Sequence, residues 1–322
     1  MIKENTILVI GGAGFIGSSL VEHLLNGGNN VIVVDNFFLG NMQNLKRVSD
    51  NSRLSIFRID ARDESTLTRL ALDFEAQFIF NLGVSPLPAS LHSPAWTFRN
   101  NVEIGIACCE VVRKHREIKL INVSSSEVYG TSKETPMTEN HPRNPLTPYA
   151  ASKNSVDDIV STYHRTFDIE AVTICPFNNY GPRQNQMEYA GLIPSLWRAF
   201  KEKRPLRIFG NGENSRDYVF VEDTARALAL CLDFESWDNP RINLATGKST
   251  SVNEVVQAFF RVLELENYPV VYADERAGDV TQHLGSFEKA LDIFNFKPRE
   301  FCDELLSLTL DYYAKSGSNY VA

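Results

Sequence analysis

The chain has 322 residues, of which 43% are hydrophobic, and a formal net charge of −8. The acidic balance, without any basic run, argues against nucleic-acid binding, and no segment approaches the roughly 18 continuous apolar residues of a membrane span. The five cysteines form no C-x-x-C pair, and the N-terminus lacks the apolar core of a signal peptide, so we expect a reduced, cytoplasmic protein. The six histidines show no metal-ligand spacing, so we expect no metal site.

The first predicted unit is a strand, a tight glycine turn and a helix. Residues 7–10 are apolar, and an apolar helical pattern follows and stops at residues 26–28. Gly11 permits the turn, Gly14 lets the backbone approach a pyrophosphate, and Gly17 lets the helix pack closely on the strand. A glycine triplet is equally compatible with an ordinary tight turn. In context, we predict an anion site at the helix N-terminus that includes Phe15 and Ile16.

An acidic residue ends the second predicted strand, residues 31–34. Asp35 lies about 20 residues beyond the glycine turn, where an acid can accept hydrogen bonds from ribose hydroxyls and repel a 2′-phosphate. The cofactor is therefore predicted to be NAD rather than NADP. Asn36, in the loop that follows, is a further predicted cofactor contact.

Two more strands are predicted to end at the same cofactor. Residues 54–60 end on Asp60, which we expect either to bind the adenine amine or to cap a helix that starts at Ala61. The two roles are compatible, and Ala61 is included in the predicted cofactor site. Residues 78–82 form the fourth strand, and Leu82 and Gly83 at its end allow a close backbone approach to the cofactor.

A long helix over 94–115 and a fifth strand over 120–123 complete a β-α alternation, which predicts an α/β fold with a doubly wound parallel (Rossmann) sheet. Chemistry in such sheets collects beyond the carboxyl ends of the strands. The fifth strand ends in Ser125, Ser126 and Glu127. A polar turn would explain the serines alone, but a glutamate beside a cofactor crevice points to chemistry.

Tyr149 and Lys153 lie one turn apart on a predicted helix over 150–167, with a proline just before the tyrosine. The lysine ammonium and the positive nicotinamide ring are expected to lower the phenol pKa, which is ordinarily about 10. Tyr149 could then accept a proton from a sugar hydroxyl that Ser125 holds. Both Tyr149 and Lys153 are also predicted to contact the cofactor.

The remaining chain is predicted to divide between two domains. Residues 1–175 form the cofactor-binding Rossmann domain, to which residues 217–247 return, and residues 176–216 and 248–322 form a smaller C-terminal lobe. The elements expected there are a sixth strand at 171–175, a rigid loop at 176–184, helices at 192–203, 223–234, 251–264, 286–293 and 303–315, strands at 206–209 and near 243–247, and a polar loop at 276–280.

The ordered motifs resemble those of the extended short-chain dehydrogenase/reductase superfamily, in its nucleotide-sugar epimerase/dehydratase branch. The resemblance covers nearly the whole chain and rests on the glycine triplet, Asp35, S-S-S-E-V-Y-G, Y-x-x-x-K, F-N-x-Y-G-P-R, R-D-Y-x-F-V-x-D and R-x-G-D. It implies that the N-terminal region binds NAD and that the smaller lobe is a substrate-binding lobe for a nucleoside diphosphate sugar. It also implies a homodimer that pairs through the helices at 94–115 and 149–167.

The same resemblance assigns roles to individual residues. Ser125, Tyr149 and Lys153 match the catalytic serine, tyrosine and lysine. The matched substrate contacts are Ser126, Asn178, Arg216 and Arg276, and Asn101 matches an asparagine near the active site. The arginines would offset the phosphate charges, although a surface ion pair is the alternative for either one.

Glu127 is the residue that best separates the possible reactions. All begin with oxidation at sugar C4. In 4,6-dehydratases an acid at this place removes the C5 proton and helps expel the C6 hydroxyl, whereas simple 4-epimerases usually lack it. A glutamate with no proton-transfer role is the alternative. The S-S-E-V-Y-G pattern is similar to mannose-nucleotide dehydratases and UDP-glucuronate decarboxylases, but dTDP-glucose dehydratases have aspartate where Ser126 stands.

We therefore predict a 4,6-dehydratase first, a 4-epimerase second and a decarboxylase third. A cofactor-sensing binding protein without activity is the alternative from another class, and the intact Ser125, Tyr149 and Lys153 argue against it. Three departures from the family pattern suggest an unusual subfamily, namely those at 81–84, 175–176 and 285–286.

Overall fold

The computed structural model describes residues 4–275 and 278–316. A seven-stranded sheet with the order β10-β6-β5-β4-β1-β2-β3 forms its centre, and every adjacent pair in it is parallel. Its strands are β1 (Thr6–Ile10), β2 (Asn30–Asp35), β3 (Leu54–Arg58), β4 (Phe78–Asn81), β5 (Lys119–Val123), β6 (Ala171–Pro176) and β10 (Asp238–Leu244). The predicted doubly wound α/β sheet is confirmed.

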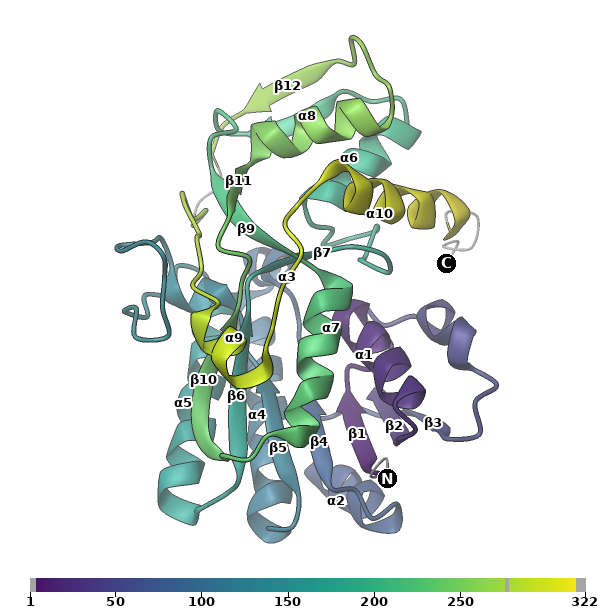
Figure 1. The fold of residues 1–322 in the computed structure, drawn as a ribbon, viewed down its shortest axis with the longest axis vertical. Coiled ribbons are helices and arrows are strands. Elements are labelled where there is room, and N and C mark those ends of the chain that lie inside the picture. Colours follow the sequence, from purple (N-terminus) through teal and green to yellow (C-terminus); the bar gives the residue numbers. More distant parts are fainter. Residues whose placement is uncertain (1–3, 276–277, 317–322) are drawn as a thin grey trace.

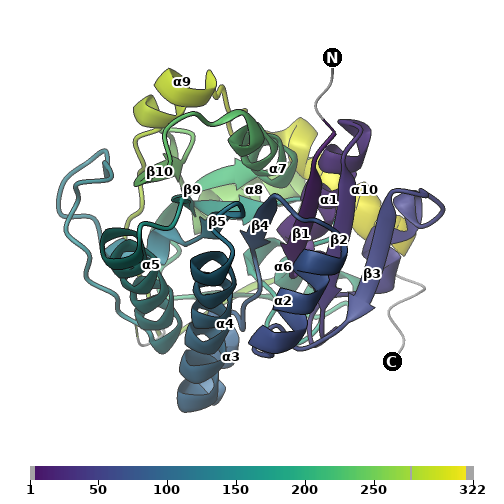
Figure 2. The ribbon, with the colours of Figure 1, turned by 90° about the horizontal axis from the view of Figure 1, so that it is seen from below.

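Helices cover both faces of this sheet, so the central strands are apolar on both sides, as parallel strands generally are. Figure 2 shows α4 and α5 on one side and α7 on the other. Leu8, Ile79 and Leu120 belong to the core beneath the first group, and Val9, Phe80 and Ile121 to the core on the other face. The covering helices are α1 (Phe15–Asn26), α2 (Glu64–Asp73), α3 (Leu87–His92), α4 (Pro94–Lys114), α5 (Pro148–Phe167), α7 (Val221–Leu230) and α9 (Glu288–Phe294).

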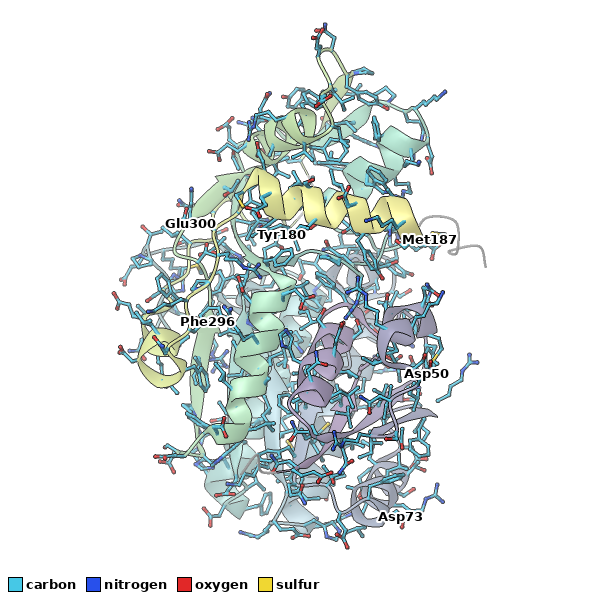
Figure 3. The ribbon with its side chains drawn as sticks, turned by 45° about the vertical axis from the view of Figure 1, so that its right-hand side comes forward. Asp50, Asp73, Tyr180, Met187, Phe296 and Glu300 are labelled. Carbon is cyan, nitrogen blue, oxygen red and sulfur yellow. The ribbon has the colours of Figure 1, made fainter. Side chains whose placement is uncertain are left out.

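A smaller lobe lies beyond the carboxyl ends of the large sheet (Figure 1). It contains a three-stranded sheet β11-β9-β7 and a two-stranded sheet β12-β8. Tyr180 belongs to the core of this lobe and lies just below α10 in Figure 3, with its ring centroid 5.1 Å from that of Phe301. The elements are β7 (Asn178–Tyr180), α6 (Leu192–Lys201), β8 (Leu206–Phe209), β9 (Ser215–Phe220), β11 (Ser249–Ser251), α8 (Val252–Val262), β12 (Val270–Ala273) and α10 (Asp303–Ser316).

Most differences from the expected elements are short or lie at element ends. The helix expected over 223–234 begins at Val221, ends at Leu230 and continues as a 3₁₀ turn, η3 (Cys231–Asp233). Two further 3₁₀ helices, η1 (Met42–Val48) and η2 (Ser126–Tyr129), were not expected. The strands β7, β11 and β12 were also missed, because strands of three or four residues carry too little alternation to be recognised.

Candidate active site

A cleft of about 800 Å³ opens where the large sheet meets the smaller lobe. Its floor consists of residues at or just beyond the carboxyl ends of five parallel strands, namely Gly11, Asp35, Leu82, Val123 and Pro176. Its opposite wall comes from α6, β8 and β9 of the smaller lobe. Since ligands of doubly wound sheets bind at this edge, the cleft is the candidate site.

The glycine turn at the start of α1 fits tightly against its surroundings. Gly11 has a φ of +75°, and a Cβ there would lie 2.9 Å from the backbone carbonyl of Leu82. A Cβ on Gly17 would lie 2.2 Å from the backbone oxygen of Gly11, so only glycine allows α1 to start this close to the turn. Gly14, Phe15 and Ile16 line the cleft together with these two glycines. The turn thus presents bare backbone where a pyrophosphate would bind.

Asp35 ends β2 with its side chain fixed toward the same turn. Its carboxylate accepts hydrogen bonds from the backbone N–H of Ala13, at 3.0 Å, and of Phe37, at 2.8 Å. Burial raises the pKa of this carboxyl, and the two backbone donors act against that shift. Asn36 lines the cleft beside it. A carboxylate held in this way keeps lone pairs for the two hydroxyls of a ribose, so the residues present fit an NAD molecule.

Replacing Gly17 with alanine is expected to weaken NAD binding at least about tenfold, because a Cβ 2.2 Å from the Gly11 oxygen must displace the turn. The measurement is the dissociation constant for NAD, with unfolding followed in parallel. Gly27→Ala at the other end of α1 is the matched control, since its Cβ would meet the Asn29 side chain at 3.2 Å. Equal NAD affinity in both variants would contradict the proposed cradle.

The third and fourth strands contribute unequally to the cleft. Ala61, Leu82 and Gly83 line it, but Asp60 does not appear among its lining residues. The Asp60 carboxylate instead accepts hydrogen bonds from the backbone and side chain of Arg62. The expectation that Asp60 caps a helix is wrong, because the helix begins later and Asp63 caps it by accepting from the Thr66 backbone.

Ser125, Tyr149 and Lys153 meet at the end of β5 and line the cleft. Thr147 caps α5 and Pro148 starts it, which places Tyr149 and Lys153 on successive turns. The Ser125 hydroxyl and the Tyr149 phenol are hydrogen-bonded to each other, and the buried Lys153 ammonium donates to the backbone oxygen of Val123. This arrangement is suited to removing a proton from a bound hydroxyl.

The protein groups alone do not lower the pKa of Tyr149. Burial raises it to about 12; the Ser125 hydrogen bond opposes this shift and the Glu127 charge adds to it. Burial lowers the pKa of Lys153, which is already engaged with Val123. The expectation that the Lys153 ammonium and the nicotinamide ring together lower the Tyr149 pKa concerns the NAD-bound protein and stays a prediction. A positive nicotinamide ring is the remaining group that would favour the phenolate.

Glu127 projects into the cleft from η2, next to the catalytic candidates. Ser125 caps η2 by accepting from the Glu127 backbone N–H at 3.3 Å. Burial raises the pKa of the Glu127 carboxyl, while the Arg216 charge lowers it and Asp279 raises it. A carboxyl with a raised pKa is suited to both accepting and returning a proton.

Three of the four predicted substrate-binding residues line the cleft, namely Ser126, Asn178 and Arg216. The Arg216 guanidinium is oriented by donating to the backbone oxygens of Val280, at 2.6 Å, and Ser215, at 3.0 Å. Arg276 lies outside the described residues.

Asn101 does not line the cleft and supports its wall from behind. Its side-chain oxygen accepts from the Ser85 backbone at 2.7 Å, and its amide donates to the Ser152 hydroxyl at 2.9 Å. Its neighbour Asn100 lines the cleft instead.

Aromatic and cationic residues that the sequence reading missed also line the cleft. Phe38 packs edge-on against Trp96, with ring centroids 5.1 Å apart, and lies 6.3 Å from the Tyr189 ring. These three rings come from segments distant in sequence, so no local pattern joins them. The smaller lobe adds three more cations, Arg198, Arg204 and Arg207.

The described residues show neither a metal cluster nor a helix that could span a membrane. Within 4–275 and 278–316, no cluster of three or more histidine, cysteine, aspartate or glutamate side chains could hold a metal ion. Over the same part of the chain, every helix is too short or too polar to cross a membrane.

Comparison with known proteins places this cleft among related enzymes. A model of the family described as GDP-mannose 4,6 dehydratase matches residues 8–309. A UDP-glucose 4-epimerase of Mycolicibacterium smegmatis is 30% identical over 308 residues, which is 95% of this chain and 97% of the relative.

Two solved structures share the fold over nearly their full length. The UDP-glucose 4-epimerase of Thermotoga maritima, with UDP-glucose, has a TM-score of 0.89 at 30% identity, covering 97% of this chain and 99% of that one. The dTDP-glucose 4,6-dehydratase DesIV of Streptomyces venezuelae, with NAD bound, has a TM-score of 0.91 at 27% identity, covering 97% and 98%.

Proposed function

Because the chain belongs to the NAD-dependent nucleotide-sugar epimerases and dehydratases of the extended short-chain dehydrogenase/reductase superfamily, we propose that it is a nucleotide-sugar 4,6-dehydratase. The chain is an NAD-dependent enzyme that modifies nucleotide sugars. The observation that supports a 4,6-dehydratase in particular is the Glu127 carboxyl, which lines the cleft together with Ser125 and Tyr149 and has a raised pKa.

The proposed roles follow from the positions of the side chains. The bare turn at Gly11, Gly14 and Gly17 would hold the pyrophosphate of NAD, and Asp35 its ribose. Arg216 and Asn178 would contact the diphosphate of the substrate. In this proposal the domain of the large sheet, with α9 packed on it, holds NAD, and the smaller lobe, which includes β9, holds the nucleotide sugar.

NAD, when bound, supplies the hydride acceptor for C4 and the hydride donor for the final reduction. The protein moves the protons. Tyr149 accepts the proton of the C4 hydroxyl while Ser125 holds that oxygen, which yields a 4-keto sugar. The ketone acidifies C5, and Glu127 removes the C5 proton and delivers it to the C6 oxygen, which leaves as water while a C5=C6 double bond forms. The final reduction would then add hydride at C6 and a proton from solvent at C5.

Replacing Glu127 with glutamine is expected to allow C4 oxidation and to block elimination, because the amide cannot accept the C5 proton. Reduced cofactor absorbing at 340 nm should still form, while loss of water and exchange of the C5 hydrogen with deuterated solvent should fall at least about a hundredfold. Glu134→Gln, an exposed residue outside the cleft, is the control. Unimpaired dehydration in the Glu127 variant would rule out this function for the residue.

A 4-epimerase is the second candidate, and two observations favour it. Ser126 stands where a second acid would assist elimination, and the Mycolicibacterium smegmatis relative is a UDP-glucose 4-epimerase. In an epimerase the 4-keto sugar is reduced on its other face, and Glu127 removes no proton. The two candidates differ in product mass.

We also propose that the protein is a homodimer through α4 and α5. Phe98 and Ile106 of α4 and Phe167 of α5 are exposed apolar side chains on these helices. A second copy of the same face would cover them.

A further inference from the structure

A buried histidine lies directly behind the cleft wall. The His283 ring lies between the Ser126 hydroxyl, 3.4 Å from its Nδ1, and the Gly130 backbone oxygen, 2.8 Å from its Nε2. Its exposed fraction is 1%, and Phe177 packs edge-on against it with ring centroids 6.0 Å apart. The backbone of His283 is itself tied to β9, because its N–H donates to the Ser215 oxygen. The ring is therefore fixed in place.

The two contacts determine which atoms carry hydrogen. A backbone carbonyl only accepts, so the proton of the ring is on Nε2 and is donated to Gly130. Burial lowers the pKa of His283 to about 3, with the Arg216 charge adding to that shift, so the ring is neutral at physiological pH. In a neutral ring with hydrogen on Nε2, Nδ1 is a bare acceptor. The Ser126 hydroxyl must then donate to it.

This direction leaves Ser126 as an acceptor toward the cleft. A hydroxyl has one hydrogen and two lone pairs, and the Ser126 hydrogen is engaged with His283. Ser126 lines the same wall as Ser125 and Glu127, between them in sequence. A substrate group facing Ser126 therefore has to supply a hydrogen-bond donor, and a group with only lone pairs would meet an unfavourable contact.

We propose that Ser126, held by His283, accepts a hydrogen bond from the C6 hydroxyl of the sugar and so selects hexose over hexuronate substrates. This inference rests on the proposed function, in which Glu127 acts at C5 and its proton goes to the C6 oxygen. The hydrogen bond to Ser126 orients that oxygen and makes it more basic toward this proton. A hexuronate presents a carboxylate at the same carbon, which has no hydrogen to donate and adds a charge beside Glu127. His283 is a positioning residue that acts through Ser126.

The test compares two sugars that differ only at C6. Dissociation constants for UDP-glucose and UDP-glucuronate are measured by calorimetry on the NAD-loaded protein, with GDP-mannose and GDP-mannuronate as the purine pair. The wild-type protein is expected to bind the hexose at least about tenfold more tightly than the uronate of the same pair. A merely structural role of the two residues would change both constants together and leave their ratio unaltered.

Ser126→Ala is expected to lower the ratio by about three- to tenfold, because the acceptor is lost. His283→Phe is expected to lower it as well, because the freed Ser126 hydroxyl can turn and donate to a carboxylate. Ser126→Thr, which keeps the hydroxyl, should restore the wild-type ratio. His141→Phe is the matched control: this buried histidine also bonds two backbone groups, the Lys133 N–H and the Pro142 oxygen, but it does not line the cleft.

The outcomes separate this inference from the proposed function. An unchanged ratio in Ser126→Ala, in protein that still binds the hexose nucleotide, overturns the selection by Ser126 and leaves the proposed function standing. If His283→Phe fails to fold, the selection by Ser126 is still tested, because the Ser126→Ala variant measures it independently. If the wild-type protein binds neither pair, the same comparison is made with the dTDP and CDP pairs. Failure to bind any of the four hexose nucleotides would contradict the proposed function and this inference together.

Discussion

Replacing Tyr149 with phenylalanine is expected to lower kcat by at least about a hundredfold, because general acid–base groups contribute roughly 10²- to 10⁴-fold to a reaction. Tyr149 is the phenol that lies next to both Ser125 and the cleft. Phenylalanine keeps the ring and removes only the hydroxyl, so NAD affinity and stability should change little. The measurement is kcat with the nucleotide sugar that turns over fastest.

Tyr163→Phe is the matched control for this variant. Tyr163 lies on the same helix, α5, and its hydroxyl donates to the Glu110 carboxylate at 2.8 Å, away from the cleft. Its loss should leave kcat within about twofold, since it takes no part in proton transfer. Unchanged turnover in Tyr149→Phe would show that the proposed proton path is wrong.

The largest expected effect on stability comes from a buried ion pair beneath the active site. Arg241 of β10 donates to the Asp157 carboxylate of α5 at 2.8 Å, and the Asp157 side chain is 1% exposed. The same carboxylate accepts from Asn122 at 2.9 Å and from the Ser124 hydroxyl at 2.6 Å, so it links α5 to β5 one turn after Lys153. The pair thus joins three elements that position the catalytic candidates.

Arg241→Met is expected to lower the free energy of unfolding by about 3–5 kcal/mol, because it leaves a buried carboxylate without its cation. Urea denaturation measures this directly. The double variant Arg241→Met/Asp157→Leu should recover part of the loss, since no isolated charge remains, although Asn122 and Ser124 lose their acceptor.

An exposed ion pair supplies the control for that experiment. Arg261 donates to Asp303 at 2.7 Å, with 60% and 46% of the two side chains exposed. Arg261→Met should therefore cost less than about 1 kcal/mol. A loss of the same size in both variants would contradict the assigned importance of the buried pair.

The parts of the fold that depend on residues close together in sequence could be predicted from the sequence. The apolar strand before Gly11 and the helix after it form one continuous segment, so their order and geometry follow from periodicity and turn chemistry. The same holds for α5, where a proline start and one-turn spacing place Tyr149 above Lys153. These features need no knowledge of distant segments.

Features that depend on distant segments could not be predicted. His283 is far in sequence from Ser126, and no local pattern joins them. The aromatic residues Phe38, Trp96 and Tyr189 meet only because two loops and the start of α4 converge. The direction of the Tyr149 pKa shift also required the fold, because it depends on burial rather than on the neighbouring lysine.

The measurement that tests the account most directly is the product mass after incubation with NAD and the UDP-, GDP-, dTDP- and CDP-linked hexoses and hexuronates. A 4,6-dehydratase is predicted to convert at least one of them to a product 18 mass units lighter, with no net consumption of NAD. Unchanged mass with altered sugar stereochemistry by NMR would contradict dehydration and establish epimerisation. Loss of 44 mass units from a hexuronate nucleotide would establish decarboxylation and contradict both the dehydratase and the selection by Ser126.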